Sequence, residues 1–159
     1  MGVYAVSSLF SGSAANWDQL ETILEDHMPV ASFSASHTSL QSTNSTSFAT
    51  ITGHTVSVTG LDGDERIVVN MNMAISGGNT GDSWRLRLDF GGSYSDEIEF
   101  EPAAAVTDGK HVHLGWSHNF DNDASGSVTY NLQWKANAAP TDSVYSIQGR
   151  SEILVLKRR

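Results

Sequence analysis

Six histidines and several groups of carboxylates are the residues of this chain that could do chemistry. His111 and His113 stand two positions apart on a predicted strand, so they share a face and could chelate a metal ion. A third ligand such as His118 would lie on the other face, with Trp116 and Phe120. No acidic ligand stands nearby, so we interpret the pair as surface or subunit-contact histidines and predict no metal site.

Residues 121–126, from Asp121 to Gly126, reproduce the opening of a calcium loop, with oxygen-bearing side chains at positions 1, 3 and 5 and glycine at position 6. Position 12 of that loop type requires glutamate, and Leu132 stands there. A hairpin turn between two predicted strands explains the same residues, and a weak calcium site is the alternative. The acidic residues 62–65 are interpreted in the same way.

Glu97 and Glu99 project to one face of a short predicted strand, where two carboxylates could act as acid and base in glycoside hydrolysis. Ile98 and Phe100 mark the opposite face as core, so the carboxylates are the solvated or inter-subunit side. The chain has no Gly-x-Ser-x-Gly, no phosphate-binding glycine loop and no nucleophile with a base nearby. We therefore predict no enzymatic activity and no cofactor.

Charge restricts the partners of this chain. Its 159 residues include 18 acidic and 9 basic ones, which gives a formal net charge of −9. Lys157, Arg158 and Arg159 close the chain, and without them 6 basic residues face 18 acidic ones, a charge of −12. Such a body repels a phosphate backbone, so we predict no nucleic-acid binding by it. The basic tail is either a docking point for an acidic partner or a solvated end that protects the last strand.

The length fits one domain, and the absence of cysteine excludes disulfides and thiolate chemistry. The chain begins without the features of a signal peptide. No stretch approaches the roughly 20 apolar residues that span a bilayer. We expect a soluble protein that makes no membrane contact.

Residues 1–30 are predicted to form an arm and a short amphipathic helix. Asn16 can cap this helix, with Gln19 three positions later. The apolar face consists of Trp17, Leu20, Ile23 and Leu24. A helix of about ten residues is marginal alone, so this face packs on its own domain or docks on a partner subunit.

From residue 31 to 159 the pattern changes to an alternation of apolar and polar residues, which predicts eight to ten strands. The clearest are residues 55–59, 67–75, 83–90, 97–100, 111–120, 127–135 and 153–156. Polar turns at short spacing indicate antiparallel pairing, and one buried face for each strand predicts a two-sheet sandwich or jelly roll. The Ser/Thr-rich residues 32–47 are a long loop or a weakly specified edge strand.

Arg85 and Arg87 occupy the non-core face of one predicted strand, opposite Trp84 and Leu86. In an otherwise acidic protein, these guanidinium groups could pair with carboxylates of a neighbouring strand or of a neighbouring chain. Both possibilities remain open from the sequence, and we therefore include the two arginines among the candidate partner-binding residues.

The chain is free of cysteine and rich in Ser, Thr and Asn. It contains two characteristic strand segments, Val-Thr-Tyr-Asn-Leu-Gln-Trp-Lys at residues 128–135 and the closing Gly-Arg-Ser-Glu-Ile-Leu-Val-Leu at residues 149–156. This style and strand order resemble small structural proteins of tailed-bacteriophage virions, which are similar to trimeric jelly rolls of the tumour-necrosis-factor and complement C1q type. The resemblance covers about residues 31–159. It implies a homotrimer on the virion surface, attached through its N-terminal segment and soluble in the host cytoplasm before assembly.

Within that resemblance two functions compete. A head decoration or cement protein would bind the major capsid protein or another virion protein, and the short chain without a fibrous shaft favours this role. A receptor-binding or lectin-like module would hold host glycans on exposed aromatic residues. Trp84, Trp116 and Trp134 are predicted to face the core, which leaves Trp17 and Tyr94 as candidates for glycan contact.

Overall fold

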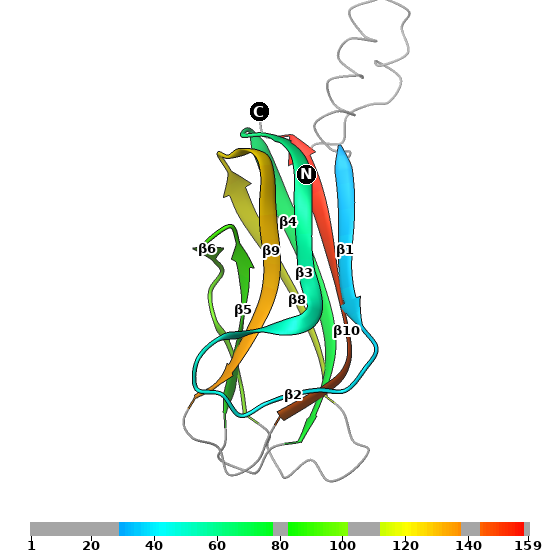
Figure 1. The fold of residues 1–159 in the computed structure, drawn as a ribbon, viewed down its shortest axis with the longest axis vertical. Helices are drawn as coiled ribbons and strands as arrows, with labels where there is room; N and C mark the ends of the chain where they lie inside the picture. Colours follow the sequence, from blue (N-terminus) through cyan, green and yellow to red (C-terminus); the bar gives the residue numbers. More distant parts are fainter. Residues whose placement is uncertain (1–28, 78–82, 102–111, 138–143, 158–159) are drawn as a thin grey trace, which may run out of the picture.

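A computed structural model describes residues 29–77, 83–101, 112–137 and 144–157 of the chain (Figure 1). Every regular element in these ranges is a β-strand. The strands are β1 (Ala31–His37), β2 (Gln41–Thr43), β3 (Ala49–Asp62), β4 (Glu65–Gly77), β5 (Trp84–Phe90), β6 (Ser93–Tyr94), β7 (Ile98–Phe100), β8 (Val112–Asn122), β9 (Ser125–Ala136) and β10 (Val144–Lys157). The prediction of an all-β domain is confirmed.

The strands form two antiparallel sheets. Sheet A has the order β1-β10-β4-β8, and β2 also pairs with β10. Sheet B has the order β3-β9-β5-β6, and β7 also pairs with β5. Along the chain, β1, β3, β4, β5, β8, β9 and β10 alternate between the two sheets, which is the winding of a jelly roll. The predicted sandwich is therefore confirmed.

One detail of the predicted topology is wrong. The segment at residues 121–126 is not a hairpin, because it joins β8 of sheet A to β9 of sheet B. The short turn after β3 likewise crosses from sheet B to β4 of sheet A. Side-chain alternation indicates which face of a strand is buried, but it carries no information about which sheet the strand joins.

The space between the sheets is filled by the apolar faces that the alternation predicts. The large buried side chains of β5 and β9 are Trp84, Leu86, Leu88, Phe90, Tyr130, Leu132 and Trp134, each at most 4% exposed. Trp116 on β8 is half-buried and packs against this core. Full burial of a large apolar side chain contributes roughly 1.5–3 kcal/mol, so these strands hold the two sheets together.

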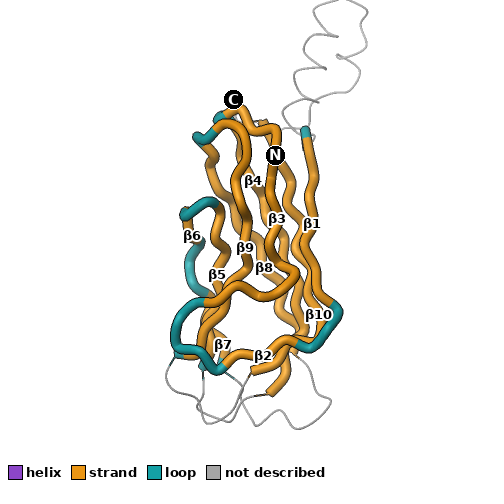
Figure 2. Tube along the Cα trace, in the orientation of Figure 1, coloured by secondary structure: helices purple, strands orange, loops and turns teal. Residues whose placement is uncertain are grey.

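The Ser/Thr-rich residues 32–47 contain two short edge strands (Figure 2). β4 pairs with β10 along one side, from Val144 to Lys157. On the other side, β1 opposes residues 149–155 of β10 and β2 opposes residues 144–146. The interpretation as an edge strand is correct for β1 and β2, and a loop separates them.

β3 bends sharply in its first half, and its register with β9 shifts between Thr50 and Thr55 (Figure 2). Gly53 lies inside the shift with a φ of 86°, in the left-handed region that glycine tolerates best. A Cβ atom at Gly53 would stand 2.6 Å from the carbonyl oxygen of Ser36 on β1. Glycine therefore lets β3 approach β1 closely, and it places His54 beneath the end of β1.

The described chain enters and leaves the sandwich at the same end (Figure 1). The Val30 N–H donates to the Val155 carbonyl oxygen at 2.8 Å, so the first residues of the sandwich lie beside the last ones. Residues 1–28, with the predicted helix face, and residues 158–159 lie outside the described residues. The domain boundary at residue 30 stays a prediction. Among the described residues, no helix has the length and apolar character needed to cross a membrane.

Candidate functional site

Lys157, a predicted partner-binding residue, already has partners within the chain. Its Nζ lies 2.7 Å from a carboxylate oxygen of Asp62, 2.8 Å from one of Asp64 and 3.4 Å from one of Glu65. These carboxylates raise the pKa of Lys157 above its usual range. The positive charge of Lys157 is therefore compensated inside the chain. Arg158 and Arg159, the other two residues of the predicted basic tail, lie outside the described residues.

Glu65 is the buried member of this acidic end and is 1% exposed. Burial by itself raises the pKa of its carboxyl group. Hydrogen bonds from the backbone N–H groups of Asp62 and Gly63, from the Asn122 amide and from the Lys157 ammonium outweigh burial and lower that pKa to about 2. Glu65 thus anchors the turn after β3 and ties it to the end of β8.

The acidic residues 62–65 have the carboxylate oxygen atoms that a cation site needs, but these atoms surround the ammonium group of Lys157. One oxygen each of Asp62, Asp64 and Glu65 lie within 4.8 Å of one another. The Lys157 ammonium is within 3.4 Å of all three residues and occupies the position that a metal ion would take. The calcium-like segment at residues 121–126 is a turn, in which the Asn122 amide group donates to Ala124 and accepts from it.

Arg85 and Arg87 lie on the outer face of sheet B, as the alternation predicts, and Arg85 pairs within its own chain. Its Nη1 is 2.9 Å from Glu97, and its Nη2 is 3.2 Å from Glu99, which stands opposite on β7. Two carboxylates therefore compensate this guanidinium group, and they raise its pKa. The intrachain alternative for Arg85 is the one that the structure supports.

Arg87 makes a different set of contacts. Its Nε donates to Gln133 at 2.8 Å, and its guanidinium carbon lies 3.9 Å from the ring centre of Phe48 and 3.8 Å from that of Tyr94. The cation is thus held between two aromatic faces. Tyr94, a predicted glycan contact, therefore has one ring face covered by Arg87. Phe48 was not a candidate, because it stands alone in a Ser/Thr-rich segment.

The rest of this outer face is also bonded to itself. Asp89 accepts hydrogen bonds from Asn131 and Gln133, and Thr55 donates to Asn131. The Lys135 ammonium lies 4.4 Å from the Phe48 ring centre and 3.9 Å from a Glu97 oxygen. These side chains of sheet B therefore have partners across neighbouring strands, and each such pair contributes roughly 0.2–1 kcal/mol to the sheet.

The outer face of sheet A is polar as well, but its side chains are largely unpaired. The outward positions of its strands carry Ser32, Ser34, Ser36, Asn70, Asn72, His113, Ser117, Asn119 and Gln148. Within the described ranges, none of these side chains makes a hydrogen bond or ion pair. The ion pairs of this face are Arg150 with Glu152 and Arg66 with Asp121. This face offers free donors and acceptors to a ligand.

Only one member of the predicted pair His111 and His113 lies among the described residues. His113 is exposed on the outer face of sheet A, and His111 lies outside the described residues. His118 lies on the other face of β8, with its ring 4.6 Å from the Phe120 ring and 6.1 Å from the Trp116 ring. The predicted separation of His118 from His113 is confirmed, so the two cannot bind one ion from an unbroken strand.

Sequence reasoning missed a second histidine pair, which is buried where the two sheets meet. His37 on β1 is 6% exposed, His54 on β3 is 0% exposed, and His37 Nδ1 lies 2.8 Å from His54 Nε2. Gly149 on β10 packs against both rings, because a Cβ atom there would be 2.7 Å from His37 and 2.9 Å from His54. Gly53 and Gly149 are the only sequence signal, and neither predicts a histidine contact.

One arrangement of protons satisfies this buried network with both imidazoles neutral. The Tyr130 hydroxyl donates to Ser151, whose hydroxyl can donate to His54 Nδ1. His54 Nε2–H then donates to His37 Nδ1, and His37 Nε2–H donates to Ser146 Oγ, 3.0 Å away. Ser146 passes the last hydrogen bond to the Ala74 carbonyl. The chain of hydrogen bonds crosses between the sheets without a charged group.

Burial sets the protonation of both histidines. Desolvation lowers the pKa of His37, and desolvation together with the neighbouring His37 lowers the pKa of His54 to about 4. Both effects disfavour the imidazolium form, because a positive charge there would have neither water nor a carboxylate to stabilise it. The two rings are therefore neutral at pH 7, and they act as structural hydrogen-bonding groups.

No protein-family model matches this sequence, and neither does any curated protein. Its fold matches solved structures. VP2 of infectious bursal disease virus, in a subviral particle, has a TM-score of 0.52 and 8% identity over 81% of this chain and 34% of that chain. T=1 particles derived from infectious bursal virus give a TM-score of 0.51 and 8% identity over 81% of this chain and 32% of theirs. Both of these solved structures come from virus particles.

An identity of 8% shows a shared fold and nothing more specific. The chain spans about a third of the length of these viral proteins. The jelly roll alone is what they have in common with it.

Proposed function

We propose that this protein is a structural protein of a virion, most specifically a head decoration or cement protein that binds and stabilises the capsid shell as a homotrimer. The fold that it shares with particle-forming viral proteins supports the structural role. The observation that carries the attachment model is that residues 30 and 155 lie side by side at one end of the sandwich. Both predicted anchoring segments, residues 1–28 and 158–159, therefore start from that end.

Attachment of this kind needs contact area and no chemistry. The apolar residues Trp17, Leu20, Ile23 and Leu24 would bury surface against the major capsid protein or another virion protein. Arg158 and Arg159 would pair with acidic groups of that partner, while Lys157 stays bound to its own carboxylates. On this proposal the sandwich lies on the capsid surface, and the protein is in the host cytoplasm before assembly.

The proposed homotrimer uses surfaces other than the arginine face of sheet B. Arg85 and Arg87 are engaged by Glu97, Glu99, Gln133 and two aromatic rings of the same chain. Light scattering of the purified full chain tests the oligomeric state, and a mass of three chains is expected. A monomer at the concentrations found on particles would contradict the trimer.

Deletion of residues 1–28 tests the attachment model. The truncated chain should keep its cooperative unfolding transition, because both sheets begin after residue 30. It should no longer sediment with particles that lack the protein, at concentrations where the full chain saturates them. The variant Arg158→Ala with Arg159→Ala should bind more weakly, and Arg150→Ala, on the outer face of sheet A, is the matched control that should bind normally. Full occupancy by the truncated chain would refute the model.

A further inference from the structure

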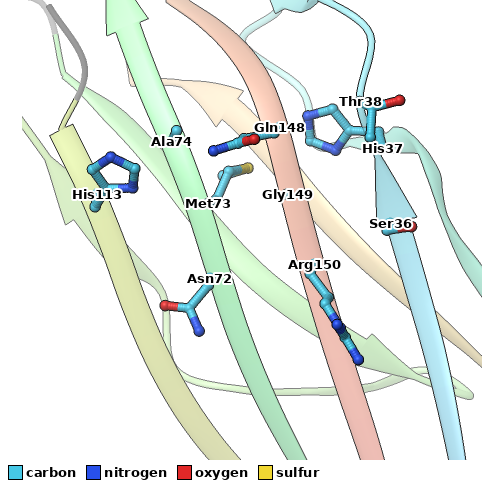
Figure 3. A pocket seen from close by; sticks show the side chains of 10 residues that line it. All are labelled: Ser36, His37, Thr38, Asn72, Met73, Ala74, His113, Gln148, Gly149 and Arg150. Atoms are coloured by element: carbon cyan, nitrogen blue, oxygen red, sulfur yellow. The ribbon is translucent and has the colours of Figure 1, made fainter.

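A pocket of about 340 Å³ opens on the outer face of sheet A (Figure 3). Its rim consists of exposed polar side chains from four strands and the residue that follows β1: Ser36, Thr38, Asn72, His113, Gln148 and Arg150. The other lining residues are Met73, Ala74, Gly149 and His37, all of them buried. This volume lies at the lower end of small-molecule sites, which are roughly 300–1,000 Å³.

The pocket exists because a small residue occupies an outward position of the sheet, while its neighbours on the adjacent strands have longer side chains. Ala74 has an outward position on β4, between Gln148 of β10 and His113 of β8. It is nevertheless only 2% exposed, because the longer neighbours enclose it. One row further along the sheet, Asn72 stands between Arg150 and Gly115, and Gly115 leaves room for the Asn72 side chain, whose Oδ1 would be 3.3 Å from a Cβ atom there. The β-bulge of β10 between Ser146 and Gln148 turns the Gln148 amide toward this space (Figure 3).

The chemistry of the walls selects the kind of ligand. Among the described residues no carboxylate lines the pocket, and its guanidinium group, on Arg150, is already 2.7 Å from a Glu152 oxygen. The amides of Asn72 and Gln148 can each donate and accept hydrogen bonds, and neither makes one within the described residues. Groups that both donate and accept match hydroxyls, whereas an apolar surface matches C–H faces. A saccharide ring has both properties.

We infer that this pocket binds a neutral saccharide unit, with Asn72 and Gln148 as its principal hydrogen-bonding residues. Ala74, with the backbone of its neighbours Met73 and Gly149, would contact the ring carbons, and Ser36, Thr38 and His113 would contact peripheral hydroxyls. This inference does not depend on attachment to a capsid. It holds equally for a free protein, so the failure of one proposal leaves the other in place.

Nuclear magnetic resonance of the full chain, labelled with ¹⁵N, tests the inference directly. The probes are the methyl glycosides of glucose, galactose, mannose and the N-acetylhexosamines, added at millimolar concentration. At least one should produce saturable shifts in the side-chain amide signals of Asn72 and Gln148. Methyl glucuronide forms the anionic arm of the test. Saturable binding of that probe alone would overturn the assignment to a neutral ligand, and so would the absence of saturable shifts with any neutral probe.

Two variants and a matched control locate the site. Asn72→Ala and Gln148→Ala should each raise the Kd of the responding glycoside about fivefold, since each removes one or two hydrogen bonds. Asn119→Ala removes an exposed amide from the same outer face outside the pocket, and its Kd should stay within about twofold of the parent. All three positions are solvent-exposed, so thermal unfolding should show intact folds. Unchanged affinity in the Asn72→Ala and Gln148→Ala double variant would overturn the site.

Discussion

Both outer faces of the sandwich are polar, but the polar side chains around Arg87 on sheet B have partners, whereas the amides around the pocket on sheet A have none among the described residues. On sheet B, Arg85, Arg87, Asp89 and Gln133 bond to neighbours of the same face, although Arg85 Nε has no partner among the described residues. On sheet A, Asn72 and Gln148 have no such partners among the described residues. A polar strand face is therefore not informative by itself. Whether it stabilises the fold or is available to a ligand depends on the residue opposite each position.

The largest effect that we expect lies directly beneath the face of sheet A. In Gly149→Ala the new Cβ would approach His37 to 2.7 Å and His54 to 2.9 Å, and both rings are buried and held by hydrogen bonds. We expect a loss of about 3 kcal/mol in the free energy of unfolding, measured by urea denaturation. Gly115→Ala is the matched control on the same sheet, because its Cβ would meet only the exposed Asn72 side chain, at 3.3 Å. Equal losses in the free energy of unfolding for both variants would contradict close packing of Gly149 against the two histidine rings.

The next effect is a dependence of stability on pH that originates at the same buried histidines. The pKa of His54 is about 4 in the folded protein and near 6.5 when unfolded, so the unfolded chain binds the extra proton first. Stability should therefore be complete above pH 6.5 and fall as the pH drops toward 4, with about 2.5 kcal/mol lost by pH 4.5. Glu65, with a pKa of about 2, affects stability only below its unfolded pKa of 4.5.

Urea denaturation between pH 7 and pH 4.5 measures this loss, and His54→Gln supplies the control. Glutamine keeps polar atoms near Ser151 but does not titrate, so the slope of stability against pH should become shallower by about one proton. His113→Gln changes an exposed histidine and should leave the slope as it is. A parent protein whose stability is flat across this range would show that the histidine pair is not a buried neutral unit.

A smaller effect separates the two faces directly. Arg87→Ala removes a hydrogen bond to Gln133 and the contacts with the Phe48 and Tyr94 rings. The free energy of unfolding should fall by about 1.5 kcal/mol. Arg150→Ala, on sheet A, removes a solvent-exposed ion pair and should change stability by less than about 0.5 kcal/mol. Thermal and urea unfolding measure both variants. Equal losses in the free energy of unfolding would contradict the difference between the two faces.

The smallest effect concerns amides. Gln133→Ala on sheet B removes hydrogen bonds with Arg87 and Asp89 and should destabilise the protein by about 1 kcal/mol. Asn72→Ala on sheet A removes no hydrogen bond that the described residues make, so its stability should match the parent within about 0.3 kcal/mol. Urea denaturation resolves this difference, and a destabilised Asn72→Ala variant would mean that sheet A also uses its outer amides for folding.

Local pattern was sufficient to predict the fold class, the buried faces of β5 and β9, and the outward positions of Arg85 and Arg87. These properties depend on alternation within one strand. The partners of those residues depend on strand pairing, so the choice between intrachain and interchain ion pairs for Arg85 could not be made from the sequence. The assignment of β8 and β9 to different sheets was out of reach for the same reason.

The buried network was not predictable, because its members are far apart in the sequence. His37, His54, Ser146 and Ser151 come from three strands, and each one alone has the sequence context of an exposed polar residue. The pocket was missed for a related reason. Ala74 and Gly115 are unremarkable in β-strands, and their role follows only from the longer side chains that pairing places beside them.

The position of β10 has a consequence for synthesis of the protein. This strand lies inside sheet A and pairs with β1, β2 and β4, yet residues 144–157 leave the ribosome after every other strand. Among the described strands, β1 and β4 do not pair with one another, and only β10 joins them. The pairing of β1 and β2 with the rest of sheet A therefore has to wait until β10 has been translated, and a truncation that removes β10 would leave the edges of β1 and β4 open to aggregation.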